Sequence, residues 1–250
     1  MPQPTSVPSP RERADVLLVK RGFFESRARA QAAIAAGLVT ADGTPVRKAS
    51  DMIAANAEIA AQPAHPYVSR GALKLVAALD AFSVDPAKRV CLDVGASTGG
   101  FSEVLLERGA QKIYAVDVGR GQLHEKLRAD ARVVSLESTD ARDLTPDLLP
   151  ERPTLLVADV SFISLKLVLP LAATLLAPDA AMAVLVKPQF EAGRARVQKG
   201  IVRDERVHEE VCRDIAAFVA GLGFRILGVI PSPIEGGDGN REFLLGAKRP

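Results

Sequence analysis

The fold of this chain is decided by residues 93–101, which read DVGASTGGF. An apolar run, Val90–Val94, leads into this stretch, and a helical pattern begins near Gly100. A glycine-rich turn between a strand and a helix presents free backbone N–H groups and lets a ligand approach the backbone closely. The turn matches neither the G-x-G-x-x-G pattern nor the Gly-Lys-Ser/Thr ending of a P-loop. A nucleotide phosphate is therefore disfavoured as its ligand, and a carboxylate remains.

From Arg89 onward, apolar runs alternate with helical patterns. The predicted strands are Val90–Val94, Ile113–Val116, Val133–Leu136, Thr154–Ala158, Ala181–Val186 and Arg225–Ile230, and the predicted helices begin near Gly100, Leu123, Leu165 and Arg206. This alternation predicts a mostly parallel sheet that helices cover on both faces. The chain then ends with a loop, 231–239, and a last strand, 242–246. Because no helix separates the last two strands, we predict that the final one is antiparallel.

The composition predicts one full α/β domain and a second, smaller domain. The chain has 250 residues, and 48% of them are hydrophobic, so a sizeable core can be buried. The formal net charge is only +2, so any basic surface for a polyanion must be local. Such a cluster occurs between residues 20 and 48, where basic residues outnumber the acidic Glu25 and Asp42. Its members are Lys20, Arg21, Arg27, Arg29, Arg47 and Lys48.

Residues 13–61 form the small domain and read as helix, turn, helix and hairpin. Ser26 can cap a helix over Arg27–Ala36, and a short strand follows at Leu38–Thr40. Asp42-Gly43 then favours a tight hairpin turn. A linker punctuated by Pro and Gly, residues 62–72, precedes a helix over residues 73–82.

Acidic residues follow the second and third strands of the predicted sheet. Asp117 stands where a carboxylate can accept from both hydroxyls of a ribose, although a solvated strand end is the alternative. Asp140 can accept from an adenine amino group. A carboxylate pocket and a ribose clamp together predict S-adenosylmethionine as the cofactor. The candidate cofactor-binding residues are Asp93, Gly95, Ala96, Ser97, Thr98, Gly99, Gly100, Phe101, Asp117, Val118, Asp140, Ala141 and Asp159.

A Lys and an Asp end the fifth and fourth strands of the predicted sheet. Both strand ends face the crevice where open α/β sheets bind ligands. Burying the charge of Lys187 at the tip of a buried strand costs free energy unless the charge has a partner. Asp159 on the neighbouring strand can supply that partner. Beside a methyl donor, such a pair can orient a substrate hydroxyl and help to deprotonate it. The alternative is a structural ion pair that closes the sheet.

Six motifs carry a resemblance to a known family. They are PYVSRG (66–71), DVGASTGGF (93–101), DVG (117–119), DVSFIS (159–164), KPQFE (187–191) and GNREF (239–243). These motifs resemble those of the TlyA family, ribosomal RNA 2'-O-methyltransferases that are often mislabelled as haemolysins. The resemblance runs from about residue 12 to residue 248.

The family resemblance implies a fold, a reaction and a catalytic tetrad. The expected fold is an FtsJ-type, Rossmann-like sheet of seven strands with the last antiparallel, after a small α+β module of the alpha-L RNA-binding type. The expected reaction is methylation of ribosomal RNA, in cytidine riboses, with ribosomal RNA or ribosomal subunits as partners. The implied Lys-Asp-Lys-Glu tetrad falls on Lys74, Asp159, Lys187 and Glu242.

We therefore divide the chain into four parts. These are a disordered extension (1–11), an RNA-binding domain (12–61), a linker (62–72) and a methyltransferase domain (73–250). Further candidate RNA contacts are Arg70 in the linker and Arg194 and Arg196 in a loop that either is merely solvated or closes over the active site.

Other function classes are disfavoured by what the sequence lacks. Cys91 and Cys212 are far apart and the His residues are scattered, so we expect no metal site. The N-terminus has no apolar signal region, and the apolar run 167–177 is too short to span a bilayer. We therefore expect a cytoplasmic protein and disfavour a membrane-lysing one. An NAD-dependent oxidoreductase is disfavoured by the glycine spacing, and a non-catalytic RNA-binding protein by the intact motifs.

Overall fold

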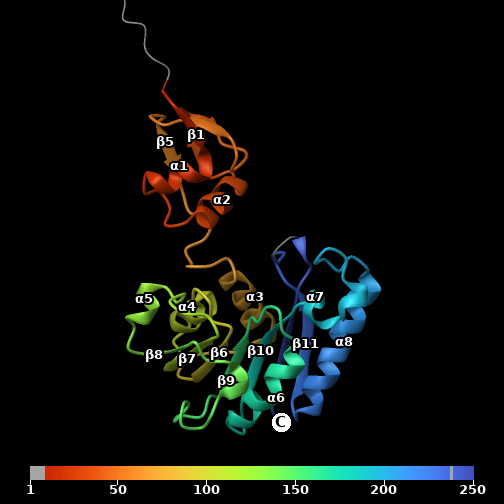
Figure 1. Ribbon diagram of the computed structural model, residues 1–250. Coiled ribbons are helices and arrows are strands. Elements are labelled where there is room, and N and C mark those ends of the chain that lie inside the picture. The colour runs from red at the N-terminus through yellow and green to blue at the C-terminus, as the bar shows by residue number, and fades with distance from the viewer. Residues whose placement is uncertain (1–8, 237–238) are drawn as a thin grey trace, which may run out of the picture. The chain divides into compact units, whose positions relative to one another are not determined.

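The computed structural model describes residues 9–236 and 239–250, and Figure 1 traces the elements in order. The chain divides into two compact units, Met1–Pro66 and Tyr67–Pro250, and each is described by itself. The division falls inside the predicted linker, residues 62–72. Residues 1–8, most of the extension predicted to be disordered, lie outside the described residues.

The N-terminal unit combines short helices with short antiparallel strands. In chain order its elements are β1 (Arg11–Arg13), α1 (Ala14–Lys20), α2 (Arg27–Ala35), β2 (Val39–Ala41), β3 (Thr44–Pro45), β4 (Met52–Ala54) and β5 (Ile59–Ala61). β1 pairs with β4, and β2 lies between β3 and β5. Ser26 caps α2 as predicted, because its Oγ accepts from the backbone N–H of Arg29. The strands β1, β4 and β5 were not predicted, because they are too short to show an alternating pattern and no tight-turn signal such as Asp42-Gly43 was recognised beside them.

The C-terminal unit is built on a seven-stranded sheet in the order β11-β12-β10-β9-β6-β7-β8. Its strands are β6 (Val90–Val94), β7 (Lys112–Asp117), β8 (Val133–Glu137), β9 (Leu155–Ala158), β10 (Ala181–Val186), β11 (Arg225–Pro231) and β12 (Phe243–Lys248). β12 runs antiparallel to both of its neighbours, β10 and β11, whereas the other pairings are parallel. The predicted antiparallel final strand is therefore confirmed.

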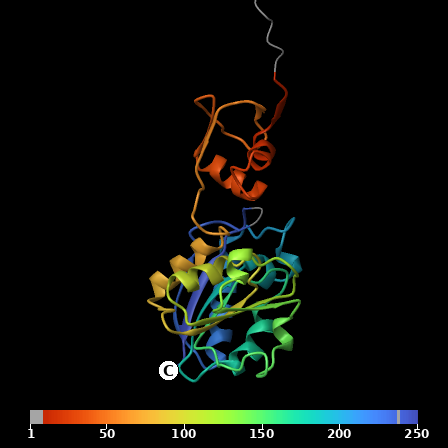
Figure 2. The ribbon, with the colours of Figure 1, turned by 90° about the vertical axis from the view of Figure 1, so that its left-hand side faces the viewer.

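Helices cover both faces of this sheet, as Figure 2 shows. The helices are α3 (Ala72–Phe82), α4 (Gly100–Glu107), α5 (Glu125–Arg128), α6 (Leu165–Leu175), α7 (Pro188–Glu191) and α8 (Glu205–Gly221). Successive strand residues point to opposite faces, so Leu92 packs with α6 and α8 while Cys91 packs with α3 and α4. Two apolar cores therefore hold the sheet between two helical layers.

The strand order places a crevice beside the carboxyl end of β6. From β6 the chain moves outward to β7 and β8, and it then returns to the other side of β6 to form β9 and β10. Open α/β sheets bind ligands at the point where the strand order reverses in this way. The glycine-rich turn after β6 and the residues that follow β9 meet at this point, because the backbone N–H of Asp159 donates to the carbonyl of Val94.

Candidate active site

The turn after β6 is shaped by a close backbone approach. Gly95 has a φ of +82°, and a Cβ built there would lie 2.4 Å from the carbonyl oxygen of Asp159. Only glycine allows both the positive φ and this approach at no steric cost. The next helix, α4, begins at Gly100, so the N–H groups of its first turn have no acceptor within the helix. The N–H groups of residues 95–97 and 99 already donate within the protein, so the backbone donors at the crevice come chiefly from the start of α4.

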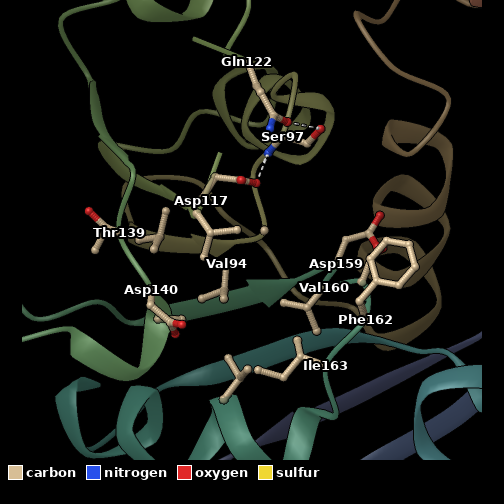
Figure 3. A pocket seen from close by; sticks show the side chains of 16 residues that line it. Val94, Ser97, Asp117, Gln122, Thr139, Asp140, Asp159, Val160, Phe162 and Ile163 are labelled. Carbon is tan, nitrogen blue, oxygen red and sulfur yellow. Dashed lines mark hydrogen bonds between the residues drawn. The ribbon is translucent and has the colours of Figure 1, made fainter. Parts of the chain in front are cut away.

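Asp117 lies at the end of β7 and holds the same turn. Its Oδ2 accepts from the backbone N–H of Ser97 at 2.8 Å, and its Oδ1 accepts from that of Gly119 at 2.7 Å. Figure 3 shows Asp117 beside Ser97 and Gln122, whose side chains are also hydrogen bonded to each other. A carboxylate has about four lone-pair sites, so Asp117 can still accept from a ligand.

A cavity of about 340 Å³, called here the first cavity, opens beside Asp117. Apolar side chains from the ends of β6, β7 and β9 line its middle, and Asp140 lies on its far side from Asp117 (Figure 3). Arg142 donates to Asp140 at 2.6 Å and lowers the pKa of that carboxyl to about 2. Sequence reasoning missed the lining residues Gln122, Thr139 and Val168, and it gave Val160, Ser161, Phe162 and Ile163 only as part of a family motif.

A second cavity, of about 170 Å³, lies over the glycine-rich turn. Residues 95–98, 100 and 101 supply much of its lining, and Lys187 and Asp159 supply its charged groups. Ser69 and Gly71 line it as well, from the segment that precedes α3. This segment is anchored because the backbone N–H of Val68 donates to Glu103 on α4 at 2.6 Å. Sequence reasoning gave Ser69 and Gly71 only as part of a family motif.

Two residues predicted to bind the cofactor, Asp93 and Gly99, contact other parts of the protein. Asp93 is fully buried, and the hydroxyl of Ser102 donates to its Oδ2 at 2.7 Å. Burial is the main cause that raises the pKa of Asp93 to about 7. At Gly99, a Cβ would lie 2.1 Å from a methyl group of Leu127, so that glycine makes room for packing against α5. Both residues support the turn from beneath.

The burial of Asp93 predicts a pH-dependent stability that Asp93→Asn removes. In the unfolded chain this carboxyl ionises near pH 4, whereas in the folded chain it ionises near pH 7. Between these values the folded state binds more protons, so the unfolding free energy of the natural protein falls as pH rises. Between pH 4 and pH 7, the unfolding free energy of the Asn variant should therefore rise relative to that of the natural protein, by up to about 4 kcal/mol. Urea unfolding across this range measures the gain, with the exposed Asp80→Asn as control; parallel profiles would contradict it.

The four implied tetrad residues converge as two ion pairs. Lys187 Nζ lies 2.6 Å from Asp159 Oδ1 and donates to Ser161 Oγ at 2.9 Å. Lys74 Nζ lies 2.5 Å from Glu242 Oε2, and these two side chains are only 9% and 3% exposed. The strand register explains the convergence. Val186 of β10 pairs with Phe243 of β12, so Lys187 and Glu242 flank the same end of that pair.

Four of the six basic residues of the cluster already have side-chain partners within the N-terminal unit. Arg27 lies 2.7 Å from Asp15, which is fully buried, and Arg13 lies 3.1 Å from the same carboxylate. Arg29 pairs with Glu25, Lys20 pairs with Glu12, and Arg21 donates to the carbonyl of Ala57. Arg47 and Lys48 have exposed side chains.

The remaining candidate RNA contacts lie in the C-terminal unit. Arg70 and Arg194 are exposed, and Arg196 lies 2.5 Å from Glu210 of α8. In the described ranges, no group of three or more His, Cys, Asp or Glu side chains could hold a metal ion. No described helix is both long enough and apolar enough to cross a membrane.

These features define a class of protein. A seven-stranded sheet with an antiparallel β12 and a glycine-rich turn after β6 forms a Rossmann-like methyltransferase domain. The chain belongs to the FtsJ-like methyltransferase family, whose model matches residues 67–249, and an S4 domain model matches residues 12–59. Both the family and the fold class predicted from the sequence are confirmed.

Relatives with names and solved structures match nearly the whole chain. The chain is 46% identical to the 16S/23S rRNA (cytidine-2'-O)-methyltransferase TlyA of Mycobacterium tuberculosis, over 94% of this chain and 89% of that protein. It is 40% identical to Hemolysin A of Brachyspira hyodysenteriae, over 93% and 98%. The solved structure of a hemolysin-named protein from Streptococcus thermophilus has a TM-score of 0.77 and 44% identity, and covers 96% of this chain and 89% of that one.

Proposed function

We propose that this chain transfers a methyl group from S-adenosylmethionine to the 2'-hydroxyl of a cytidine ribose in ribosomal RNA. The family match supports the reaction class, and the name of the Mycobacterium tuberculosis relative supports the substrate. Other relatives are named as hemolysins. The geometry favours the methyltransferase. Lys187, paired with Asp159, lies where the first cavity, which suits a nucleoside, meets the second cavity, which suits a carboxylate.

The residues that line the two cavities fit S-adenosylmethionine. In the first cavity, Asp117 suits the ribose hydroxyls, and Val118 and Ile163 offer apolar contacts to an adenine. In the second cavity, the backbone N–H groups of Thr98, Gly100 and Phe101 suit the carboxylate of the amino acid end, which the N-terminus of α4 also favours. The cofactor, when bound, supplies an electrophilic methyl group that it gives up as a carbon–sulfur bond breaks.

The single observation that carries the proposal is the ion pair between Lys187 and Asp159. Both residues line the second cavity, and Asp159 also lines the first, so the pair stands where a methyl group would be presented. In its uncharged form, Lys187 Nζ accepts the proton of the ribose hydroxyl while the hydroxyl oxygen forms its new bond to carbon. Asp159 and Ser161 hold that amine in place.

The second ion pair steers the substrate. Lys74 is held by Glu242 in a buried setting, where a charge acts more strongly than in water. We assign to Lys74 the polarisation of the hydroxyl and to Glu242 the positioning of Lys74. Most of the rate then comes from holding hydroxyl and methyl group in line.

The S4 domain anchors the RNA in this proposal. Buried Asp15 fixes the guanidinium groups of Arg13 and Arg27 at the surface, where side chains about half exposed can reach phosphates. Arg47 and Lys48 add exposed charge on the same unit. Phosphate contacts of this kind supply most sequence-independent affinity for nucleic acid.

Mapping of 2'-O-methylation tests the proposal. Purified protein, S-adenosylmethionine and ribosomal RNA or ribosomal subunits are incubated, and the RNA is digested to nucleosides. We expect 2'-O-methylcytidine to accumulate only when cofactor and protein are both present. If no ribose-methylated nucleoside forms from any ribosomal substrate, the proposed function is wrong. Leakage of dye from liposomes by the pure protein would instead support the hemolysin names.

Replacing Asp117 should weaken cofactor binding. Asp117→Ala removes an ionised acceptor from the first cavity, and hydrogen bonds to charged groups contribute about 1.5–3 kcal/mol. We expect an affinity for S-adenosylmethionine that is lower by roughly 30-fold, which corresponds to about 2 kcal/mol. Calorimetric titration measures the change, with the neighbouring surface variant Asp143→Ala as control. Unchanged affinity would leave Asp117 the role of holding Ser97 and Gly119.

A further inference from the structure

Residues 197–202 form a small hairpin that none of the steps above uses. The backbone N–H of Gln198 donates to the carbonyl of Ile201 at 2.9 Å, and the N–H of Ile201 donates back to Gln198 at 3.0 Å. Lys199 and Gly200 therefore form a two-residue loop, and their φ values are +49° and +81°. Positive φ at both central positions is typical of a type I' turn. The exposed side chain of Lys199 thus stands at the tip of a tight turn.

Lys is an unfavourable residue for this position. A type I' turn favours Asn-Gly, Asp-Gly or Gly-Gly, and another residue at positive φ costs free energy. The chain meets the same requirement with Asp42-Gly43 between β2 and β3, where the φ values are +49° and +72°. Lys199 therefore bears a backbone cost that an Asn or Asp would reduce. Strain of this kind clusters at functional positions, and what Lys199 adds to the turn is its ammonium group.

Two buried side chains fix the base of the hairpin. Asn240 donates from Nδ2 to the carbonyl of Gly200 at 3.0 Å, and its Oδ1 accepts from the backbone N–H of Val202 at 3.4 Å. These two partners, a carbonyl and an N–H, also fix the orientation of the carboxamide. On the other side, Nε2 of His208 in α8 lies 2.9 Å from the carbonyl of Val202. Lys199 is therefore presented by an ordered backbone, which reduces the entropy cost of a contact.

The hairpin begins beside the proposed methyl-transfer site. A third cavity, of about 750 Å³, shares Phe162 and Ile163 with the first cavity, so the two are contiguous at the end of β9. Val197, the first residue of the hairpin, lines this third cavity. Lys199 follows two positions later, a separation that the chain spans in at most about 7 Å. A strand whose ribose reaches the methyl donor would therefore pass close to the hairpin.

The segment that carries the hairpin has an uncompensated positive charge. Residues 192–203 include no Asp or Glu. Arg194, Lys199 and Arg203 are exposed, and in the part of the chain that the structure describes none of the three has an ion-pair partner. Arg194 also lines the third cavity. Unpaired cations around a place where a nucleic-acid strand must pass suit its phosphates.

We propose that the hairpin 197–202 contacts the RNA backbone beside the methylated nucleotide and that Lys199 binds a phosphate from its tip. Contacts to phosphates set the position of a strand without reading its bases. The hairpin thereby helps to hold the ribose in line with the methyl donor. This inference rests on the proposed function, and it adds to the S4 domain an RNA contact that belongs to the C-terminal unit itself.

Lys199→Asn tests the contact without disturbing the turn. Asn tolerates positive φ, so the melting temperature of the full-length variant should not fall. We expect its affinity for ribosomal RNA to fall by roughly 3- to 10-fold at about 0.1 M salt. The slope of log affinity against log salt concentration should also become shallower by about one. Lys199→Arg keeps the positive charge and should keep most of the affinity. Filter-binding titrations over a range of salt concentrations measure both quantities.

Lys88→Asn is the matched control. Lys88 is also exposed and has a φ of +59°, but it precedes β6, at the end of the sheet opposite the site. It should bind RNA as the natural protein does. Unchanged affinity and salt slope in Lys199→Asn would overturn the inference, as would equal losses in both Asn variants or no RNA binding by the natural protein. RNA binding without any methylated nucleoside would contradict the proposed function alone, so the two failures are distinguishable.

Discussion

Lys187→Ala should lower methyl transfer by about 10²–10⁴-fold, the range typical for loss of a positioned acid–base group. Its Nζ lies 2.6 Å from Asp159 and 2.9 Å from Ser161 Oγ, where the cavities meet. The variant loses the proposed proton acceptor but keeps the carboxylate of Asp117 and the backbone donors of the glycine-rich turn. We therefore expect the affinity for S-adenosylmethionine to change by less than the rate.

The measurement is single-turnover methylation of ribosomal RNA with a labelled methyl group. Lys187→Met serves as a second variant because it keeps an apolar stem of similar length and removes only the amino group, which lies 5.9 Å from the centroid of the Phe190 ring. Lys166→Ala, which removes an exposed Lys paired with Asp214 of α8, is the matched control and should keep its activity. Near-normal turnover by a folded Lys187→Met protein would contradict the catalytic role. It would support the alternative, in which Lys187 and Asp159 form a structural ion pair that closes the sheet.

Gly95→Ala should destabilise the C-terminal unit by about 2–5 kcal/mol. An L-residue at a φ of +82° costs about 1–2 kcal/mol, and forcing a methyl group into packed structure costs about 1–3 kcal/mol more. The obstacle is the backbone carbonyl of Asp159, 2.4 Å from the added Cβ, and a backbone atom cannot turn aside as a flexible side chain can. The ends of β6 and β9 must separate, so cofactor affinity should fall as well.

Gly109→Ala provides the matched control for this substitution. Gly109 has nearly the same φ, +81°, but an added Cβ would only touch Ala87 at 3.8 Å. The difference between the two variants in urea unfolding therefore isolates the close approach from the cost of the dihedral angle. Equal destabilisation by both variants would show that β6 and β9 do not need this approach.

The two units of the chain have different roles in the proposed reaction. The cavities and both ion pairs lie within Tyr67–Pro250, whereas the basic cluster between residues 20 and 48 lies within Met1–Pro66. Much of that cluster is already paired, above all Arg27 with the buried Asp15, whose pKa is lowered chiefly by its hydrogen bond with Arg13. If these arginines contact RNA as proposed, their order before binding reduces the entropy that binding must cost.

The sequence by itself determined the elements of the sheet and its antiparallel final strand. Apolar runs of five or six residues that alternate with helical patterns report local structure directly, and β6 and β10 have the predicted bounds. The strand-end positions of Asp117, Asp159 and Lys187 followed from the same reading. Such residues must meet at one edge of a parallel sheet, whatever the details of packing.

The family resemblance named Lys74 and Glu242, but only the tertiary structure decided how such distant residues come together. Lys74 and Glu242 are separated by 168 positions, and their contact depends on α3 lying over β12 next to β10. Phe162 and Gln189 line one cavity because the segment after β9 lies near α7, which follows β10, and no periodic pattern marks either position. Asp93 stands in a ligand-binding motif but is buried beneath its turn with Ser102. A sequence pattern reports neighbours along one element, whereas contacts between elements follow from the strand order and from the packing of helices on the sheet.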